Sequence, residues 1–245
     1  MPEERWSGFS YIVTNLARFI RPNEVTFSGV NSNLPMMACL LAKDAYDFYF
    51  TYINVAGGVD PHPTKVPISS SDPMLAAGTQ SIFSNEDFYD LCTRGGMDLC
   101  FLGAAQIDGE GQTNVSVIGD WHAPKVRLPG GGGGAVMLPT ARRSCTWRTE
   151  HSPRVLVEQL DFVTASGGMH GLVTPIAVFV KRDGRLVLQS WHPEKTLDEV
   201  IARTGFPIDG KGATPTPLPT AREQAALAAL DPAGAFEEAA HVTLD

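Results

Sequence analysis

Residues 48–58, which read FYFTYINVAGG, decide the fold. The run from Phe48 to Ile53 is aromatic and β-branched with few polar interruptions, and this pattern is typical of a strand that is buried on both faces. The run ends at Asn54–Gly58, where the small residues favour a turn. Strands buried on both faces belong to parallel sheets covered by helices, so the segment predicts an α/β fold.

The neighbouring segments alternate between helical and strand patterns. Helices are expected over residues 12–20, 36–45, 84–95, 196–205 and 220–231, the last three opening with the capping boxes Ser84/Asp87, Thr196/Glu199 and Thr220/Glu223. Further strands are expected at 25–30, 99–103, 136–138, 144–147, 162–164, 177–180 and 186–188, the last two forming a hairpin around Asp183 and Gly184. The chain shows no repeat and no long linker, so residues 1–245 are expected to form one domain.

Composition narrows the classes of partner. The 245 residues carry 19 Lys and Arg against 27 Asp and Glu, a net charge of −8, and the charges are scattered. This disfavours nucleic-acid binding and a polybasic membrane surface. The four cysteines lie in apolar stretches without metal or disulfide spacing, and no apolar run reaches 18 residues. The sequence therefore predicts a cytoplasmic protein with no membrane span and no nucleic-acid partner.

The glycine run Gly130–Gly134 is the clearest local excess in composition. It nominally contains GxGxxA, but Pro139 follows too soon for a long helix and residues 125–129 form a poor strand, so a dinucleotide site is not expected. Two interpretations remain: a flexible linker, or a loop whose backbone N–H groups approach a ligand oxygen.

Other chemistry receives little support from the residues alone. The six histidines are too widely spread for a zinc pattern, so no metal is expected, and no GxSxG elbow is present. Glu150 and His151 follow an expected strand and could act as an acid–base pair, although an ordinary exposed pair is the more common arrangement.

Several motifs, in order, resemble class I coenzyme A transferases. They are RGGMD at 94–98, LGAAQID at 102–108 with Gly111 and Asn114, IGDWHAPK at 118–125, the glycine loop, Glu150–His151, and the closing segments 171–179 and 196–206. The resemblance is to the β subunit, in particular the small subunit of glutaconate CoA-transferase, and covers roughly residues 10–240. It implies an open, mainly parallel sheet flanked by helices.

One departure from this family is decisive for mechanism. The family's β subunit carries a nucleophilic glutamate in a turn after a buried strand, which forms an acyl anhydride and then a glutamyl-CoA thioester. Alignment on Gly57, Asp60 and Pro63 places Val55 at that position, and its neighbours Asn54 and Ala56 cannot replace a carboxylate. No catalytic residue is therefore assigned to this chain.

The resemblance implies a pocket for an acyl-CoA substrate. The expected wall consists of Val55, Ala56, Gly57, Gln106, Asn114, Gly131, Gly132 and Gly133. Gln106 and Asn114 could instead satisfy loop backbone groups, and Arg94 could only close its helix. Coenzyme A is part of the substrate, and no separate cofactor is expected.

Without the glutamate, the chain resembles the β subunit of the family's heteromeric hydrolases, which open the last ring in actinobacterial steroid (cholesterol) catabolism. This implies an α subunit that brings the base, in an αβ or (αβ)2 assembly. A true transferase would need Glu86, Glu110 or Glu150 as its nucleophile, and a non-catalytic structural subunit is the third hypothesis.

Overall fold

The computed structural model describes residues 6–242 and 244. Its helices are α1 (Gly8–Ala17), α2 (Asn33–Ala45), η1 (Pro73–Ala76, a 3-10 turn), α3 (Asn85–Thr93), α4 (Gly134–Thr140), α5 (Leu197–Ala202), α6 (Ala221–Leu230) and α7 (Ala235–Ala240). Its strands are β1 (Val25–Ser28), β2 (Thr51–Asn54), β3 (Gly58–Val59), β4 (Ser81–Ile82), β5 (Leu99–Gly103), β6 (Gln106–Ile107), β7 (Thr113–Asn114), β8 (Val117–Gly119), β9 (Pro124–Arg127), β10 (Arg143–Trp147), β11 (Met169–Val173), β12 (Ala177–Arg182), β13 (Arg185–Trp191) and β14 (Thr214–Pro215).

Ten strands form one mixed sheet in the order β14-β13-β12-β11-β10-β5-β1-β2-β3-β4. Its centre, from β2 through β1, β5 and β10 to β11, is parallel, and antiparallel pairs join β3 and β4 on one side and β12 and β13 on the other. The chain runs outward from β1 to β2, then returns to place β5 on the opposite side of β1. The order therefore reverses between β1 and β5, where open α/β sheets bind ligands at the carboxyl ends of their strands.

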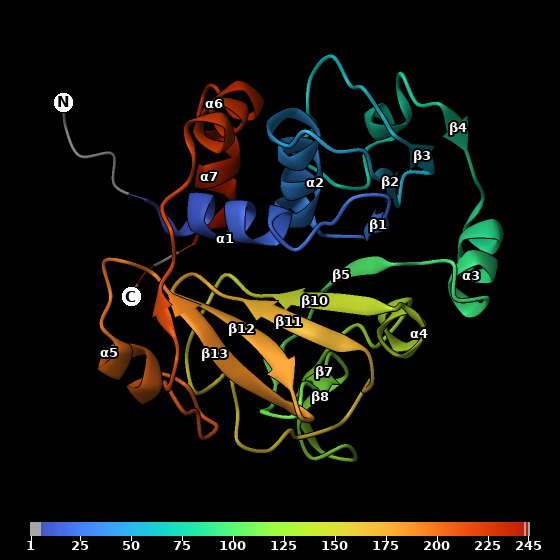
Figure 1. The fold of residues 1–245 in the computed structure, drawn as a ribbon. Helices are drawn as coiled ribbons and strands as arrows, with labels where there is room; N and C mark the ends of the chain where they lie inside the picture. The colour runs from blue at the N-terminus through green and yellow to red at the C-terminus, as the bar shows by residue number, and fades with distance from the viewer. Residues whose placement is uncertain (1–5, 243, 245) are drawn as a thin grey trace.

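Helices cover both faces of the sheet (Figure 1). On one face α1, α2, α6 and α7 pack on Tyr52, Leu99 and Phe101, and on the other α3 and α4 pack on Cys100 and Leu102. The alternation along β5 explains its uninterrupted apolar sequence, because successive side chains enter different cores. The prediction of a mainly parallel, helix-flanked sheet is confirmed.

The capping boxes begin α3, α5 and α6 as predicted, with Ser84, Thr196 and Thr220 accepting a hydrogen bond from the third helical residue. The predicted hairpin joins β12 and β13, and both Asp183 and Gly184 have positive φ, as the turn requires. The segment at 48–53 forms a shorter strand than expected, because pairing with β1 begins only at Thr51.

Three local predictions are wrong. Residues 136–138 belong to the short helix α4, which contains Pro139 near its end, instead of a strand. Residues 162–164 form an irregular segment, with Val163 exposed, and only Ala165 makes an isolated bridge. Residues 125–129 were expected to be a poor strand, but residues 124–127 form β9 and pair with β8. All four residues of β9 are exposed, which is why the sequence shows no buried-strand pattern there.

Two further features concern the cysteines and the helices of the described residues. All four cysteines are buried with free thiols. No helix in the described part of the chain has the length and hydropathy needed to cross a membrane.

Candidate active site

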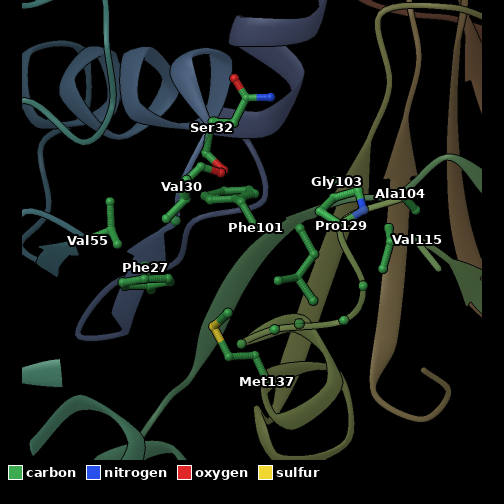
Figure 2. A pocket seen from close by; sticks show the side chains of 18 of the residues that line it. Phe27, Val30, Ser32, Val55, Phe101, Gly103, Ala104, Val115, Pro129 and Met137 are labelled. Atoms are coloured by element: carbon green, nitrogen blue, oxygen red, sulfur yellow. The ribbon is translucent and has the colours of Figure 1, made fainter. Parts of the chain in front are cut away.

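A cavity of about 520 Å³ lies at the carboxyl ends of the central strands, where the strand order reverses. The segments that follow β1, β2, β5 and β10 all reach it, and the glycine loop and α3 complete its lining. Figure 2 shows Val55, Phe27 and Val30 on one side of this cavity and Met137 and Pro129 on the other. The topology therefore brings together residues that are far apart in the sequence.

The lining is mainly apolar. Phe27 stacks on Phe88 with ring centroids 4.1 Å apart, and Phe101 and Met137 extend the same surface. The few polar side chains come from Asn31, Ser32, Asn85 and Tyr89. Among the described residues that line the cavity there is no Asp, Glu, His, Cys or Lys, and Arg148 is the one charged side chain. This described wall therefore offers no carboxylate, thiol, imidazole or amine that could act as a nucleophile or base.

Val55 follows β2 directly and is half-buried in the cavity wall. Its N–H donates to the Ser28 carbonyl of β1 at 3.1 Å, which fixes it beside the point where β1 ends. The preceding Asn54 is fully buried, and its Oδ1 accepts from the N–H groups of Ala56 (3.0 Å) and Gly58 (3.4 Å). The Asn54 side chain therefore holds the turn.

The glycine loop forms the opposite wall, with Gly131, Gly132 and Gly133 all lining the cavity. Gly132 has φ +45°, and a Cβ on Gly131 would lie 2.8 Å from the Ala135 Cβ and 2.9 Å from the Thr164 Cγ2. The N–H groups of residues 131–134 donate to no acceptor among the described residues. The loop can therefore present bare backbone donors to a ligand oxygen.

Gln106 and Asn114 lie outside the cavity lining, and both are buried. Asn114 Nδ2 donates to Gln106 Oε1 at 2.7 Å, and Asn114 Oδ1 accepts from the N–H groups of Ser116 and Val117. The neighbouring carbonyls of Val115 and Ser116 in turn accept from Gly130 and Leu128. These two polar residues therefore support the glycine loop from behind. Ala56 and Gly57 also lie outside the lining, so of the eight predicted wall residues the structure brings together Val55 and Gly131–Gly133.

The match to known proteins agrees with this geometry. The model of the family described as coenzyme A transferase matches residues 10–202. The chain belongs to the coenzyme A transferase family. It is 31% identical to the B subunit of 3-oxoadipate CoA-transferase from Pseudomonas knackmussii over 88% of this chain and 89% of that protein.

Two solved structures of this fold are also similar. One is the decarboxylase AibA/AibB, with a TM-score of 0.89, 29% identity and coverage of 96% of this chain and 98% of that one. The other is glutaconate coenzyme A-transferase from Acidaminococcus fermentans, with a TM-score of 0.83, 23% identity and coverage of 95% and 97%. The second match shows the fold alone.

The carboxylates that a transferase could use in place of the glutamate lie away from the cavity. Glu86 and Glu110 are exposed, and the Glu150 carboxylate accepts from Ser152 Oγ (2.6 Å) and Arg154 Nη2 (2.7 Å). Asp60 is buried beside Lys43 Nζ at 2.6 Å and accepts from the Tyr52 N–H at 2.8 Å. None of these side chains lines the cavity.

Glu150 and His151 form neither an acid–base pair nor the ordinary exposed pair that the sequence favoured, because their side chains have separate partners and His151 is buried. His151 is buried, with Nδ1 2.7 Å from Thr174 Oγ1 and Nε2 3.0 Å from Thr204 Oγ1. Burial is the main cause that lowers the pKa of His151 to about 3, so the imidazole is neutral near pH 7. His151 therefore joins the segment after β10 to the ends of β11 and α5.

Arg148 is the site residue that sequence reasoning missed. It follows β10 immediately, and its backbone N–H donates to the Val173 carbonyl at 3.0 Å. The signal was available in principle, because the residue after a central parallel strand lies at the ligand-binding edge of the sheet. The expected strand at 144–147 ended one residue earlier, and no motif includes Arg148.

Proposed function

We propose that this chain is the β-type subunit of a heteromeric enzyme that acts on the acyl part of a CoA thioester without carrying coenzyme A on its own side chains. The observation that carries the proposal is the apolar Val55 at the family's nucleophile position, in a cavity whose described lining holds no carboxylate. An α subunit is part of the proposal, because similar proteins are named as B subunits and the cavity wall lacks a base.

The reaction we favour is hydrolysis of a C–C bond that opens the last ring of a steroid-derived cyclic ketone CoA ester. A base on the α subunit takes a proton from water as the water adds to the ring ketone. The bond from that carbon to its neighbouring ring carbon then breaks, the neighbouring carbon takes a proton, the former ketone carbon becomes a carboxylate, and the thioester remains intact. The free N–H groups of residues 131–134 stabilise an oxygen that gains negative charge in this step. No step in this sequence needs a nucleophile from the present chain.

Decarboxylation is the second candidate, and a specific observation favours it. The chain is 29% identical to the decarboxylase AibA/AibB over nearly its whole length. An apolar cavity favours loss of CO2 because the negative charge spreads away from the carboxylate as the bond breaks. This reaction also proceeds without a covalent intermediate on Val55.

Product analysis of the purified complex separates these reactions. The complex is incubated with a steroid-derived cyclic ketone CoA ester, with and without acetate or succinate, and the products are identified by mass spectrometry. Gain of one water in the CoA ester supports ring hydrolysis, and loss of CO2 supports decarboxylation. A new CoA ester that appears only with the added acid would contradict the proposal.

A covalent test addresses the same point. Substrate is added, borohydride reduces any glutamyl thioester, and the intact mass of this chain is measured beside a known CoA-transferase as the positive control. We expect no mass change in this chain. A change that maps to Glu86, Glu110 or Glu150 would instead support the transferase alternative.

A further inference from the structure

A second cavity, of about 500 Å³, is lined by residues from the end of α1, the segment after it and strands β10–β13. It shares no lining residue with the main cavity, so the proposed reaction does not use it. Its described lining includes Arg18, Arg21, Arg143 and His170 and contains no Asp or Glu. Burial, and then the charges of Arg143 and Arg21, lower the pKa of His170, so the imidazole is neutral near pH 7. The positive charge of this cavity therefore comes from its arginines.

The chain neutralises only part of that charge. Arg18 Nε lies 2.9 Å from Glu223 Oε1, and Arg143 Nη2 lies 2.6 Å from Glu24 Oε1. Neither carboxylate belongs to the cavity lining. The Arg21 guanidinium has no carboxylate within 4.0 Å among the described residues. Three guanidinium groups against two carboxylates leave one positive charge without compensation in the described chain.

Arg143 also has donors left over. Every hydrogen bond that its side chain makes among the described residues uses Nη2, which donates to Glu24 and to the Phe19 carbonyl. Its Nε and Nη1 have no acceptor in the described part of the chain, and neither is an inaccessible atom. Arg143 as a whole is only 8% exposed, so these donors open onto a confined space. The pair with Glu24 therefore holds Arg143 in place while other N–H groups stay free for a ligand.

A series of three hydroxyl groups leaves a further donor at the cavity wall. Tyr11 Oη lies 2.8 Å from Thr216 Oγ1, which itself donates to Ser190 Oγ at 2.7 Å. Burial raises the pKa of Tyr11, so the phenol keeps its proton and donates to Thr216. The Ser190 hydroxyl hydrogen then has no acceptor among the described residues, and Ser190 lines the cavity. Ser190 can therefore donate to a molecule bound there.

The arrangement of these donors favours a phosphate group. Arg21, Arg143 and Ser190 come from three elements, namely the segment after α1, β10 and β13. A phosphate monoester carries three acceptor oxygens and a charge of about −1.5 to −2 near pH 7, whereas a carboxylate offers two oxygens in one plane. The volume lies within the range of about 300–1,000 Å³ that is common for small-molecule sites, and Phe19 and Val178 add apolar wall. There is therefore space for an organic part beside the phosphate.

We propose that this second cavity binds the phosphate group of a small molecule, with Arg21, Arg143 and Ser190 as its hydrogen-bond donors. Arg21 supplies the uncompensated charge, Arg143 supplies donors from a fixed side chain, and Ser190 supplies a neutral donor. The site is separate from the main cavity and does not depend on the proposed function.

Calorimetric titration of the purified complex tests the site with two matched pairs of probes. The phosphate esters are ribose 5-phosphate and AMP, their counterparts without phosphate are ribose and adenosine, and inorganic phosphate is the fifth probe. We expect at least one ester to bind about tenfold to a hundredfold more tightly than its counterpart, the range expected for hydrogen bonds to a charged group. Tighter binding of an ester than of inorganic phosphate would assign the site to phosphorylated small molecules, and equal binding would assign it to free phosphate.

Three variants locate the binding. Arg21→Gln changes an exposed side chain, so the fold should tolerate it, and it should weaken binding of the phosphate probe about tenfold because the uncompensated charge is lost. Ser190→Ala should cause a smaller loss, about threefold, because it removes one neutral donor. Arg185→Gln is the matched control, since Arg185 is also an exposed arginine but lies outside the cavity lining, and it should bind the probe within about twofold of the unmodified complex.

The proposal is overturned if no phosphate probe binds, if each ester binds no more tightly than its counterpart, or if Arg21→Gln and Arg185→Gln weaken binding equally. Dissociation of the Arg21→Gln complex, with no binding of phosphate to the unmodified one, would also overturn it and would show that an acidic side chain of another subunit fills the cavity. Each of these results leaves the proposed function standing, because that reaction uses the main cavity. Transfer of coenzyme A to an added acid would remove the proposed function and leave the phosphate site intact.

Discussion

Strand β10 begins at Arg143 and is followed by Arg148, and the two arginines have opposite surroundings. At its amino end Arg143 is buried, with Nη2 2.6 Å from Glu24 Oε1 and 3.0 Å from the Phe19 carbonyl. Just past its carboxyl end, Arg148 has an unpaired Nε and no carboxylate within 4.0 Å in the described chain. The two arginines are five residues apart in the sequence, one at the first position of β10 and one directly after its last.

The difference separates an arginine that is paired within the fold from one that has no ion pair among the described residues. A buried charge that is fully paired within the chain contributes to the folded state, and removal of its partner leaves it uncompensated. A partly buried charge without an ion pair contributes little to the folded state, and its removal leaves no partner uncompensated. Stability should therefore depend more on the paired arginine at the amino end of β10 than on the unpaired arginine just past its carboxyl end.

The largest expected effect on stability comes from removing the carboxylate that pairs with Arg143. Glu24→Gln leaves the Arg143 guanidinium buried without its carboxylate, and we expect the free energy of unfolding to fall by about 3–5 kcal/mol. Urea unfolding of the complex or the chain measures this change. Asp47→Asn, which removes the partner of the exposed Arg222, is the control and should cost less than about 1 kcal/mol. A similar loss in both variants would contradict the comparison.

The glycine loop extends the comparison to the cavity at the carboxyl ends of the central strands. At Gly132 there is space for a methyl group, but φ is +45°, so Gly132→Ala should shift the loop and reduce turnover about tenfold while unfolding changes by about 1 kcal/mol. Gly184→Ala adds the same methyl group in open space at a positive φ of +82°, but it lies in the β12–β13 turn outside the cavity, and it should retain activity. Equal kinetics for both variants would support the alternative interpretation that this loop is a flexible linker.

The pH dependence of the free energy of unfolding tests His151, which is buried in the segment that follows β10. The pKa of His151 is about 3 in the folded chain and near 6.5 when unfolded, so the unfolded state binds more protons between these values. The contribution of neutral His151 is complete above pH 6.5 and is lost as pH falls toward 3. His151→Gln should reduce the fall in stability over pH 6.5–4.5 by up to about 1.4 kcal/mol per pH unit. An unchanged slope in chemical denaturation would mean that His151 titrates normally.

The smallest expected effect on stability comes from replacing the unpaired Arg148. Arg148→Gln removes a charge that has no partner in the described chain, so the free energy of unfolding without ligand should change by less than about 1 kcal/mol, or rise. Thermal unfolding of the ligand-free complex measures it. A loss as large as that of Glu24→Gln would mean that Arg148 has a structural partner after all.

The parts of the fold that could be predicted are those with local chemical signals. The capping boxes at Ser84, Thr196 and Thr220 located three helix starts, because a side chain that satisfies helix N–H groups is visible in sequence. The strand predicted at residues 136–138 was wrong because an apolar triplet is compatible with a helix or a strand. The packing of α4 against β5 and β10 decides between the two. The strand Met169–Val173 was not expected, since its glycine and histidine interrupt the apolar pattern.

The residues of the candidate site also differ in how far the sequence could predict them. Val55 and the glycine loop could be found from motifs that are contiguous in sequence, and the structure places both in one cavity. Gln106 and Asn114 follow from the same motif, but their position behind the loop depends on the pairing of β6 with β7. Arg148 carries no motif, and its place in the cavity lining follows only from the way the strand ends pack in three dimensions.

The burial of the four cysteines gives the chain a built-in reporter of local opening. Cys39, Cys92, Cys100 and Cys145 lie in α2, α3, β5 and β10, and burial raises the pKa of every one of these thiols. Thiolate is the reactive form, so each sulfur stays inert until its own element opens to solvent. The rate at which a thiol reagent labels each position therefore reads the opening free energy of that element, and the two strands and two helices can be ranked without adding any probe.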